Sequence, residues 1–270
     1  MMTSTNNDCT NDSVLNIVIS RLRHPHSSAA FTFTSLSSVL SHLSRASSAG
    51  ISLAYVLLNL MQATEHFALG FYLFIEHEYD SGDFAPLALV CVYFLGLFIA
   101  CIVLPPHGRR FDVMTAVSAY VGWVLIAFLP IWDYMSSPPP YRRSFFAISS
   151  ILHGILIPLG TIFGIASLFP QARLLRSRTD PGAVSVLALV FQTAIFALNA
   201  GYWPLRVTFN WQGWSHRYHG LHLVLLWYII TGWVTFDTGV FAIVQGSLLA
   251  IVKWQASGAT SAETEPLLVR

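Results

Sequence analysis

Six long apolar segments limit the folds open to this chain more than any other feature. Each is long enough to cross a bilayer, because a helix of about 20 apolar residues spans a hydrocarbon core of about 30 Å. Soluble domains are about 25% charged, whereas this chain is 10% charged and 54% hydrophobic. We therefore predict an all-α, polytopic membrane protein. The segments are residues 50–75, 84–104, 111–134, 144–169, 182–200 and 221–253.

A seventh membrane helix is expected before the first of these segments. Its candidate is residues 29–43, which are rich in serine and threonine. Residues 1–28 are polar and lack the basic start and apolar core of a cleavable signal. The last segment, residues 221–253, exceeds one bilayer thickness, so we expect it to tilt or to project beyond the membrane.

The distribution of charge predicts the orientation of the chain. Short cytosolic loops collect Lys and Arg, and three arginines follow the segment that ends at residue 169. The loop of residues 76–83 has four acidic residues and no Lys or Arg, which indicates the lumenal side. The N-terminus is then lumenal and the C-terminus cytosolic. The cytosolic basic residues are then Arg45, Arg109, Arg110, Arg173, Arg176, Arg178 and Lys253, and those on the lumenal side, against the rule, are Arg142, Arg143, Arg206 and Arg217.

Charge and cysteine content exclude several classes of function. The net charge of +1 gives no electrostatic reason to expect a nucleic-acid partner. The three cysteines form no disulfide framework, and no His/Cys cluster has the spacing of a metal site. No catalytic triad or phosphate-binding loop occurs either, so the expected partners are the lipid bilayer and a small molecule, with no cofactor.

Two segments carry matching polar residues at a constant separation of 133 positions. Within each segment the residues are seven apart, about two helical turns, so they lie along one face. Polar side chains in a membrane face protein or a water-filled cavity, which indicates two related bundles with a shared solute site. Amides that simply join helices are the alternative. The pairs are Ser52 with Ser185, Asn59 with Gln192, and His66 with Asn199.

Pro170 and Gln171 follow an apolar segment and precede the basic loop. Proline lacks the helix hydrogen bond and clashes with the preceding turn, so we expect the helix to kink or to end at Phe169. Together with Gly182 and the polar residues of the next segment, the pattern resembles the second repeat of the PQ-loop family. That family comprises small seven-helix membrane proteins such as cystinosin and, more distantly, the SWEET sugar transporters. A proline-terminated helix with a basic loop is the alternative.

The resemblance covers about residues 50–254 and implies a transporter of a small polar solute. It implies two parallel three-helix repeats around a linker helix, with Pro170 and Gln171 as a hinge for alternating access. At the separation of 133, these two residues correspond to Ser37 and Ser38, so the first repeat lacks the motif. A membrane scaffold that does not transport is therefore an alternative function. The implied parts are the polar segment 1–28, the first repeat 29–104 with a degenerate first helix, the linker 105–143, the second repeat 144–254 and a cytosolic tail 255–270.

Asp237 lies near the middle of its apolar segment. A low dielectric favours the protonated carboxyl group, so we expect this residue to exchange protons near neutral pH. PQ-loop transporters are similar in using a carboxylate of the last helix for proton coupling. Glu65, beside His66, is a second candidate proton site, whereas the lone His153 is expected to serve packing or hydrogen bonding. A purely structural carboxylate is the alternative for Asp237.

The chain also resembles, more weakly, the fungal integral-membrane meroterpenoid cyclases. That resemblance rests on Asn59 with Glu65, on Asp237 and on the tripeptide 202–204 (Tyr-Trp-Pro). It implies that Glu65 and Asp237 act as catalytic acids that start a cyclisation. The aromatic residues expected to stabilise cations are Trp227, Tyr228 and Trp233.

The tail ends in an acidic residue followed by two leucines, Glu263, Leu267 and Leu268. This spacing is typical of a sorting signal that an adaptor reads on a flexible cytosolic tail. With the PQ-loop resemblance it predicts a vacuolar or lysosomal membrane, whereas a cyclase would be expected in the endoplasmic reticulum.

Overall fold

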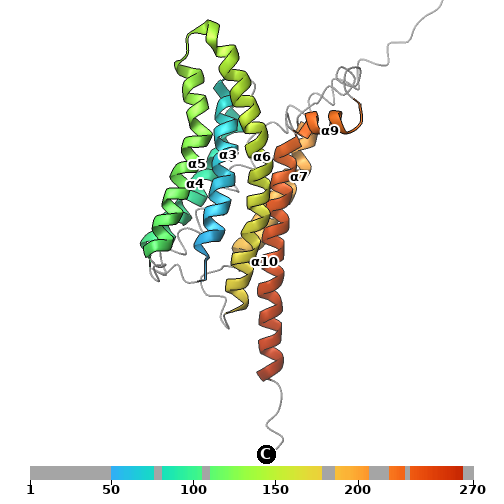
Figure 1. The fold of residues 1–270 in the computed structure, drawn as a ribbon. Coiled ribbons are helices and arrows are strands. Elements are labelled where there is room, and N and C mark those ends of the chain that lie inside the picture. Colours follow the sequence, from blue (N-terminus) through green and yellow to red (C-terminus); the bar gives the residue numbers. More distant parts are fainter. Residues whose placement is uncertain are drawn as a thin grey trace, which may run out of the picture.

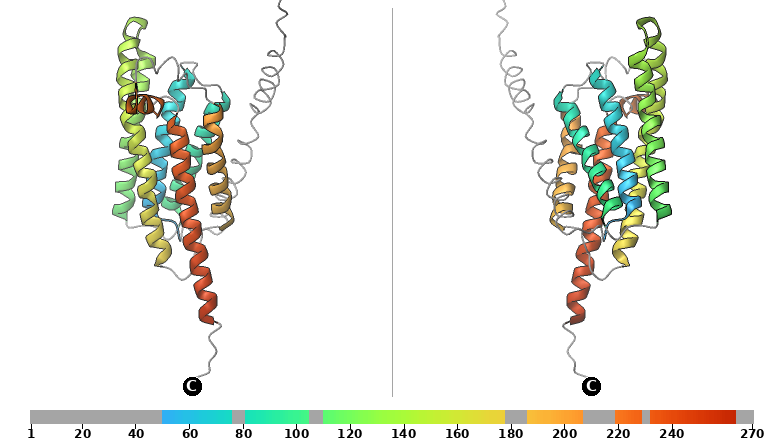
Figure 2. Two further views of the ribbon diagram at one scale, coloured as in Figure 1. Left: turned by 90° about the vertical axis from the view of Figure 1, so that its right-hand side faces the viewer. Right: turned by 90° about the vertical axis from the view of Figure 1, so that its left-hand side faces the viewer.

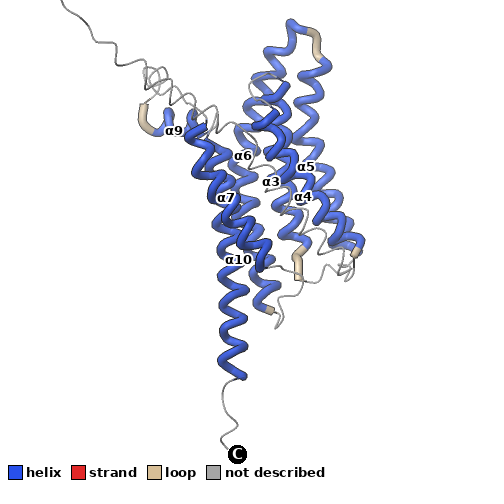
Figure 3. Tube along the Cα trace, turned by 180° about the vertical axis from the view of Figure 1, so that it is seen from behind, coloured by secondary structure: helices blue, strands red, loops and turns tan. Residues whose placement is uncertain are grey.

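The computed structural model describes residues 50–75, 81–104, 110–177, 186–206, 219–228 and 232–263. These residues form helices, with a few turn residues at the helix ends, and contain no strand (Figures 1 and 3). The expected all-α class is therefore confirmed for this part of the chain. The helices are α3 (Leu53–Ile75), α4 (Ser81–Val103), α5 (Arg110–Ser136), α6 (Pro139–Arg176), α7 (Val186–Arg206), α9 (Leu221–Trp227) and α10 (Trp233–Glu263).

Five of these helices are long and apolar enough to cross a membrane, namely α4, α5, α6, α7 and α10. This agrees with a multi-pass membrane protein. The described helices are not the seven that the sequence predicts, however. Helix α9 has seven residues and is too short to span, and the expected helix at residues 29–43 lies outside the described residues.

Helix α3 is long enough to span but too polar to be among those five. Its polar side chains are buried because α4, α5 and α6 pack around it. A helix that carries its polar groups toward other helices needs less apolar surface than one that faces lipid. In both views of Figure 2, α3 lies among the other helices of the bundle.

Successive long helices run in opposite directions, so α3 and α7 are parallel to each other, and so are α4 and α10 (Figure 1). Helix α10 packs against α6 and α7, while α5 packs against α3 and α6. The C-terminal end of α10 extends beyond the other helices (Figures 1 and 2). At 1.5 Å per residue its 31 residues are about 46 Å long, which exceeds a hydrocarbon core of about 30 Å, so this end projects from a bilayer.

Several helix boundaries differ from the prediction. Helix α6 continues through Pro170 to Arg176, so of the two outcomes predicted at this proline, a kink or an end, the end at Phe169 is wrong. A proline inside a helix costs about 3 kcal/mol, and the packing of residues beyond it, such as the buried Leu175, outweighs that cost. The stretch 221–253 is likewise not one segment, because the chain leaves the α-helix between α9 and α10.

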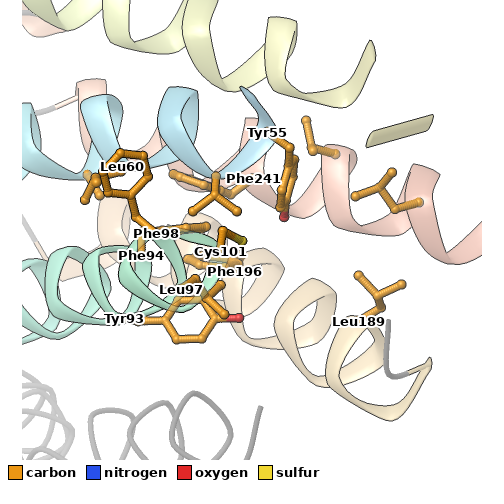
Figure 4. Packing of buried hydrophobic residues seen from close by; sticks show 14 of the residues in the cluster. Tyr55, Leu60, Tyr93, Phe94, Leu97, Phe98, Cys101, Leu189, Phe196 and Phe241 are labelled. Atoms are coloured by element: carbon orange, nitrogen blue, oxygen red, sulfur yellow. The ribbon is translucent and has the colours of Figure 1, made fainter. Parts of the chain in front are cut away.

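Two clusters of buried apolar side chains fill the bundle at different levels. Figure 4 shows the first cluster, in which the ring of Phe241 lies 5.0 Å from Phe196 and 5.8 Å from Phe94. The second cluster surrounds Trp203 and Trp233 nearer the other end. Glu65 and His66 on α3 and Asp237 on α10 lie between these clusters, at the middle of the bundle.

Helices α3 and α6 approach closely at a pair of small residues, Gly160 and Gly164. The side-chain amide of Gln62 lies over Gly164, so that a Cβ atom there would overlap it. A Cβ atom at Gly160 would lie 3.6 Å from the Gln62 Cγ, an ordinary contact. Small residues thus let a buried polar side chain of α3 fit against the α6 backbone.

Candidate functional site

One face of α3 carries the polar side chains that define the site. At 100° per residue, Asn59, Gln62, Glu65 and His66 occupy an arc of about 120°. All four are buried, with at most 6% of the residue surface exposed. The partners of this face lie on α6 and α10, so the site is formed where three helices meet.

The first pair joins α3 to α10. His66 Nε2 lies 2.5 Å from Asp237 Oδ2, and the side chain of Asp237 is fully buried. The other carboxylate oxygen, Oδ1, accepts a hydrogen bond from the Thr161 hydroxyl on α6. The ring of Trp233 lies 5.0 Å from the ring of His66. Asp237 therefore contacts α3 and α6 through its two oxygens.

The second pair joins α3 to α6. His153 Nδ1 lies 2.7 Å from Glu65 Oε1, and both side chains are buried. The ring of Tyr72 stacks on His153 at 6.3 Å, and Tyr134 meets Tyr72 edge-on at 5.4 Å. Glu65 Oε2 and His153 Nε2 are buried without a hydrogen-bond partner among the described residues.

Burial determines what these pairs can do chemically. A buried charge is costly in a low dielectric unless a partner holds it, and here each carboxyl group is held by an imidazole. Because each pair joins two helices, the interaction within a pair also contributes to the attraction between those helices.

The structure brings Asp237 and His66 into contact but separates the neighbours Glu65 and His66. Adjacent residues on a helix point about 100° apart, so these two contact α6 and α10 respectively. They form two sites instead of the single Glu65 site expected beside His66. Sequence reasoning missed the pairing of His153, which forms a hydrogen bond as expected but with a carboxylate.

The repeated amides point into the protein, as predicted from their alignment. Asn59 Nδ2 donates to the Tyr55 carbonyl at 2.7 Å, and Gln192 Nε2 donates to the Tyr93 hydroxyl at 2.8 Å. Asn199 is half-buried on α7, and Ser185 lies outside the described residues. One further amide escaped sequence reasoning, since Gln245 Nε2 donates to the Tyr55 hydroxyl at 2.8 Å.

Unpartnered amide atoms remain on the polar face of α3. In the described part of the chain, Asn59 Oδ1 and both amide atoms of Gln62 are buried without a hydrogen-bond partner. Buried polar atoms are normally satisfied. These atoms are therefore the groups that could bind a polar solute, whereas His66 is already held by Asp237.

Gln171 joins the end of α6 to the beginning of α3. Its Nε2 donates to the Gly50 carbonyl at 2.8 Å, and its Oε1 accepts from the Ser52 backbone N–H at 2.8 Å. The side chain is buried, while Pro170 is half-buried within the helix. Gln171 thus makes an interhelical contact that its sequence position alone does not reveal.

Only the first residue of the proposed tail signal is described. Glu263 is the last residue of α10, whereas Leu267 and Leu268 lie outside the described residues.

Among the described residues no group of three His, Cys, Asp or Glu side chains could hold a metal ion. Comparison with protein-family models, curated proteins and solved structures gave no match.

Proposed function

We propose that this protein is a proton-coupled transporter of a small polar solute, with a PQ-loop type of architecture. The observation that carries the proposal is the buried contact between His66 on α3 and Asp237 on α10. An ionisable pair at the middle of a membrane bundle is costly and marks proton or substrate pathways in transporters. Here it also links helices from the two proposed halves of the molecule.

Proton coupling follows from the position of the pair between helices. A change in the proton count of the pair changes the attraction between α3 and α10, which is strong in a low dielectric. Two packings of the bundle that differ at this contact then differ in proton affinity, which is the requirement for coupling a proton to a conformational change. Glu65 and His153 provide a second such contact, between α3 and α6.

The proposed architecture is three helices, a linker and three helices, with α5 as the linker. It is supported by the parallel directions of α3 and α7, and of α4 and α10 (Figure 1). The burial of both Asn59 and Gln192 supports a solute site between the repeats, with His66 and Asn199 as the further repeated positions. Pro170 and Gln171 form the proposed hinge at the end of α6.

Reconstituted protein in liposomes tests this function. We expect an inward proton gradient to drive uptake of one class among radiolabelled amino acids and sugars. Asp237→Asn should reduce that uptake on the order of a hundredfold, the scale of losing a proton-transfer group, with normal expression. Asp133→Asn is the matched control, because Asp133 is exposed at the end of α5. Unchanged proton dependence in Asp237→Asn would remove Asp237 from the mechanism.

A membrane cyclase is the second candidate, and the aromatic rings beside both pairs favour it. Trp233 lies beside His66, and Tyr72 stacks on His153, and such rings can stabilise a cation. Glu65 and Asp237 would then be the acids. The test is to supply an epoxy-terpenoid to membranes that contain the protein. If these membranes convert it, and if Glu65→Gln abolishes the conversion, the protein is the cyclase instead of the transporter.

The proposed location is the vacuolar or lysosomal membrane. It is supported by the acidic residue and the two leucines at the end of the chain, Glu263, Leu267 and Leu268. Changing both leucines to Ala in a tagged protein should shift it to the cell surface or to earlier compartments, because an adaptor no longer reads the signal. Microscopy that finds the same distribution for both proteins would show that the tail is not the address.

A further inference from the structure

We propose that Tyr228 and Thr161 form a proton relay that connects Asp237 with the end of the bundle opposite the C-terminus. The relay rests on the proposed proton exchange at Asp237. It applies equally to a transporter and to an acid catalyst, since both must bring protons to this buried carboxyl group.

The relay is a continuous series of hydrogen bonds across three helices and the end of α9. The Tyr228 hydroxyl lies 3.2 Å from the Thr161 hydroxyl, which donates to Asp237 Oδ1. Asp237 Oδ2 contacts His66 Nε2 at 2.5 Å. Thr161 and His66 contact different oxygens of one carboxyl group. A proton that reaches Oδ1 therefore changes the charge of the group that holds His66 through Oδ2.

Burial decreases from one end of the series to the other. Asp237 is fully buried and Thr161 is partly buried, whereas Tyr228 is half-exposed and directly follows α9. Figure 1 places α9 at the end of the bundle away from the C-terminus. The edge of the Phe236 ring, 5.5 Å away, holds the Tyr228 ring in place. Tyr228 is thus the outer end of the relay.

Each hydroxyl in the relay receives one proton and passes one on. A proton from outside binds the Tyr228 oxygen, the Tyr228 hydrogen moves to the Thr161 oxygen, and the Thr161 hydrogen moves to Asp237 Oδ1. The next transfer requires that Asp237 has passed its proton on and that both hydroxyl hydrogens have rotated back toward Asp237. The Ile157 carbonyl, 3.2 Å from the Thr161 hydroxyl, can accept the Thr161 hydrogen during this rotation.

The relay serves the first pair and not the second. Among the described residues, the ionisable groups around Asp237 are His66 and Glu65 on α3, His153 on α6 and the Tyr228 hydroxyl. No hydrogen bond between described residues links Glu65 or His153 to Thr161 or Tyr228. The rate of proton arrival at Asp237 should therefore depend on the two hydroxyls alone.

Trp233 offers a way to observe the proton. Its ring lies 5.0 Å from His66, and a charged imidazolium quenches indole fluorescence more than a neutral imidazole does. A rapid pH jump on purified full-length protein should give a fluorescence change, and Trp233→Phe identifies the part that comes from this tryptophan among the eight. Asp237→Asn should abolish that part.

Removing either hydroxyl should slow the fluorescence change and leave its amplitude intact. We expect Thr161→Val and Tyr228→Phe to lower the rate on the order of tenfold or more, the scale of losing a positioned proton-transfer group. Thr161→Ser keeps the hydroxyl and should retain the normal rate. Thr193→Val is the matched control, because among the described residues the Thr193 hydroxyl donates only to the Leu189 carbonyl of its own helix.

The outcomes separate the relay from the function on which it rests. A normal rate in Thr161→Val and Tyr228→Phe, or a rate in Thr161→Ser as slow as in Thr161→Val, would overturn the relay and leave Asp237 as the proton site. A Trp233 signal that persists in Asp237→Asn would instead contradict proton exchange at Asp237 itself.

Discussion

Replacing Asp237 with Val should destabilise the folded bundle by about 3–5 kcal/mol, the usual cost of removing one member of a buried ion pair. The side chain of Asp237 is fully buried, forms a hydrogen bond with His66 and accepts another from Thr161. The substitution leaves the His66 imidazole buried without its partner, whereas Thr161 can still donate to the Ile157 carbonyl. The measurement is unfolding in mixed micelles, followed by circular dichroism.

The double variant His66→Leu/Asp237→Val should recover most of this loss. Replacing both members of a buried pair by apolar residues of similar volume is often neutral, because no polar group is left unsatisfied. We expect the free energy of unfolding of the double variant to lie within about 1 kcal/mol of the wild-type value. The control Asp133→Val changes an exposed residue, and its free energy of unfolding should lie within about 0.5 kcal/mol of the wild-type value. A double variant whose loss equals the sum of the two single losses would show that the pair contributes no interaction of its own.

Replacing Gln171 with Leu should have the second largest effect on stability. The change removes two hydrogen bonds of 2.8 Å and leaves the Gly50 carbonyl and the Ser52 N–H without their partner. A buried polar group that loses its partner costs about 1–3 kcal/mol, so we expect about 2–5 kcal/mol from the two groups. The same micelle unfolding assay measures it.

Gln255→Leu is the matched control for this variant. Gln255 makes one hydrogen bond to the Leu175 carbonyl at 2.9 Å and is half-buried, so its loss should cost about 1 kcal/mol. Equal losses of stability in the two variants would mean that the contact between α6 and the start of α3 stabilises the protein no more than the contact of Gln255 does. A larger loss for Gln171→Leu would support Gln171 as the residue that closes this end of the bundle.

Much of the helical framework could be predicted from local sequence. The apolar segments found by hydropathy correspond to α3, α4, α5, α6, α7 and the α9–α10 stretch, with boundaries that differ by a few residues in most cases. The burial of Asn59 and Gln192 could be predicted from their periodicity. A polar group that faces lipid is costly whatever the other helices do, so a polar face turns toward the protein. The central position of Asp237 in the apolar stretch does not apply to its helix, because α10 begins at Trp233 and Asp237 lies about one turn inside it.

The proline at position 170 marks the limit of such local reasoning. Its chemistry predicts a helix end, yet α6 continues to Arg176 because residues beyond the proline pack against the rest of the bundle. The cost of a proline is a property of one turn, whereas the compensation comes from residues on other helices. A single sequence contains the first quantity and not the second.

By itself, the sequence determined which residues enter the membrane interior as helices and which polar side chains turn away from lipid. Only the tertiary structure decided which of those side chains meet. His66 pairs with Asp237 across 171 positions, and Glu65 pairs with His153 across 88. Hydropathy and periodicity act within a helix, so they orient each polar face, but the partner of a buried charge depends on how separate helices pack.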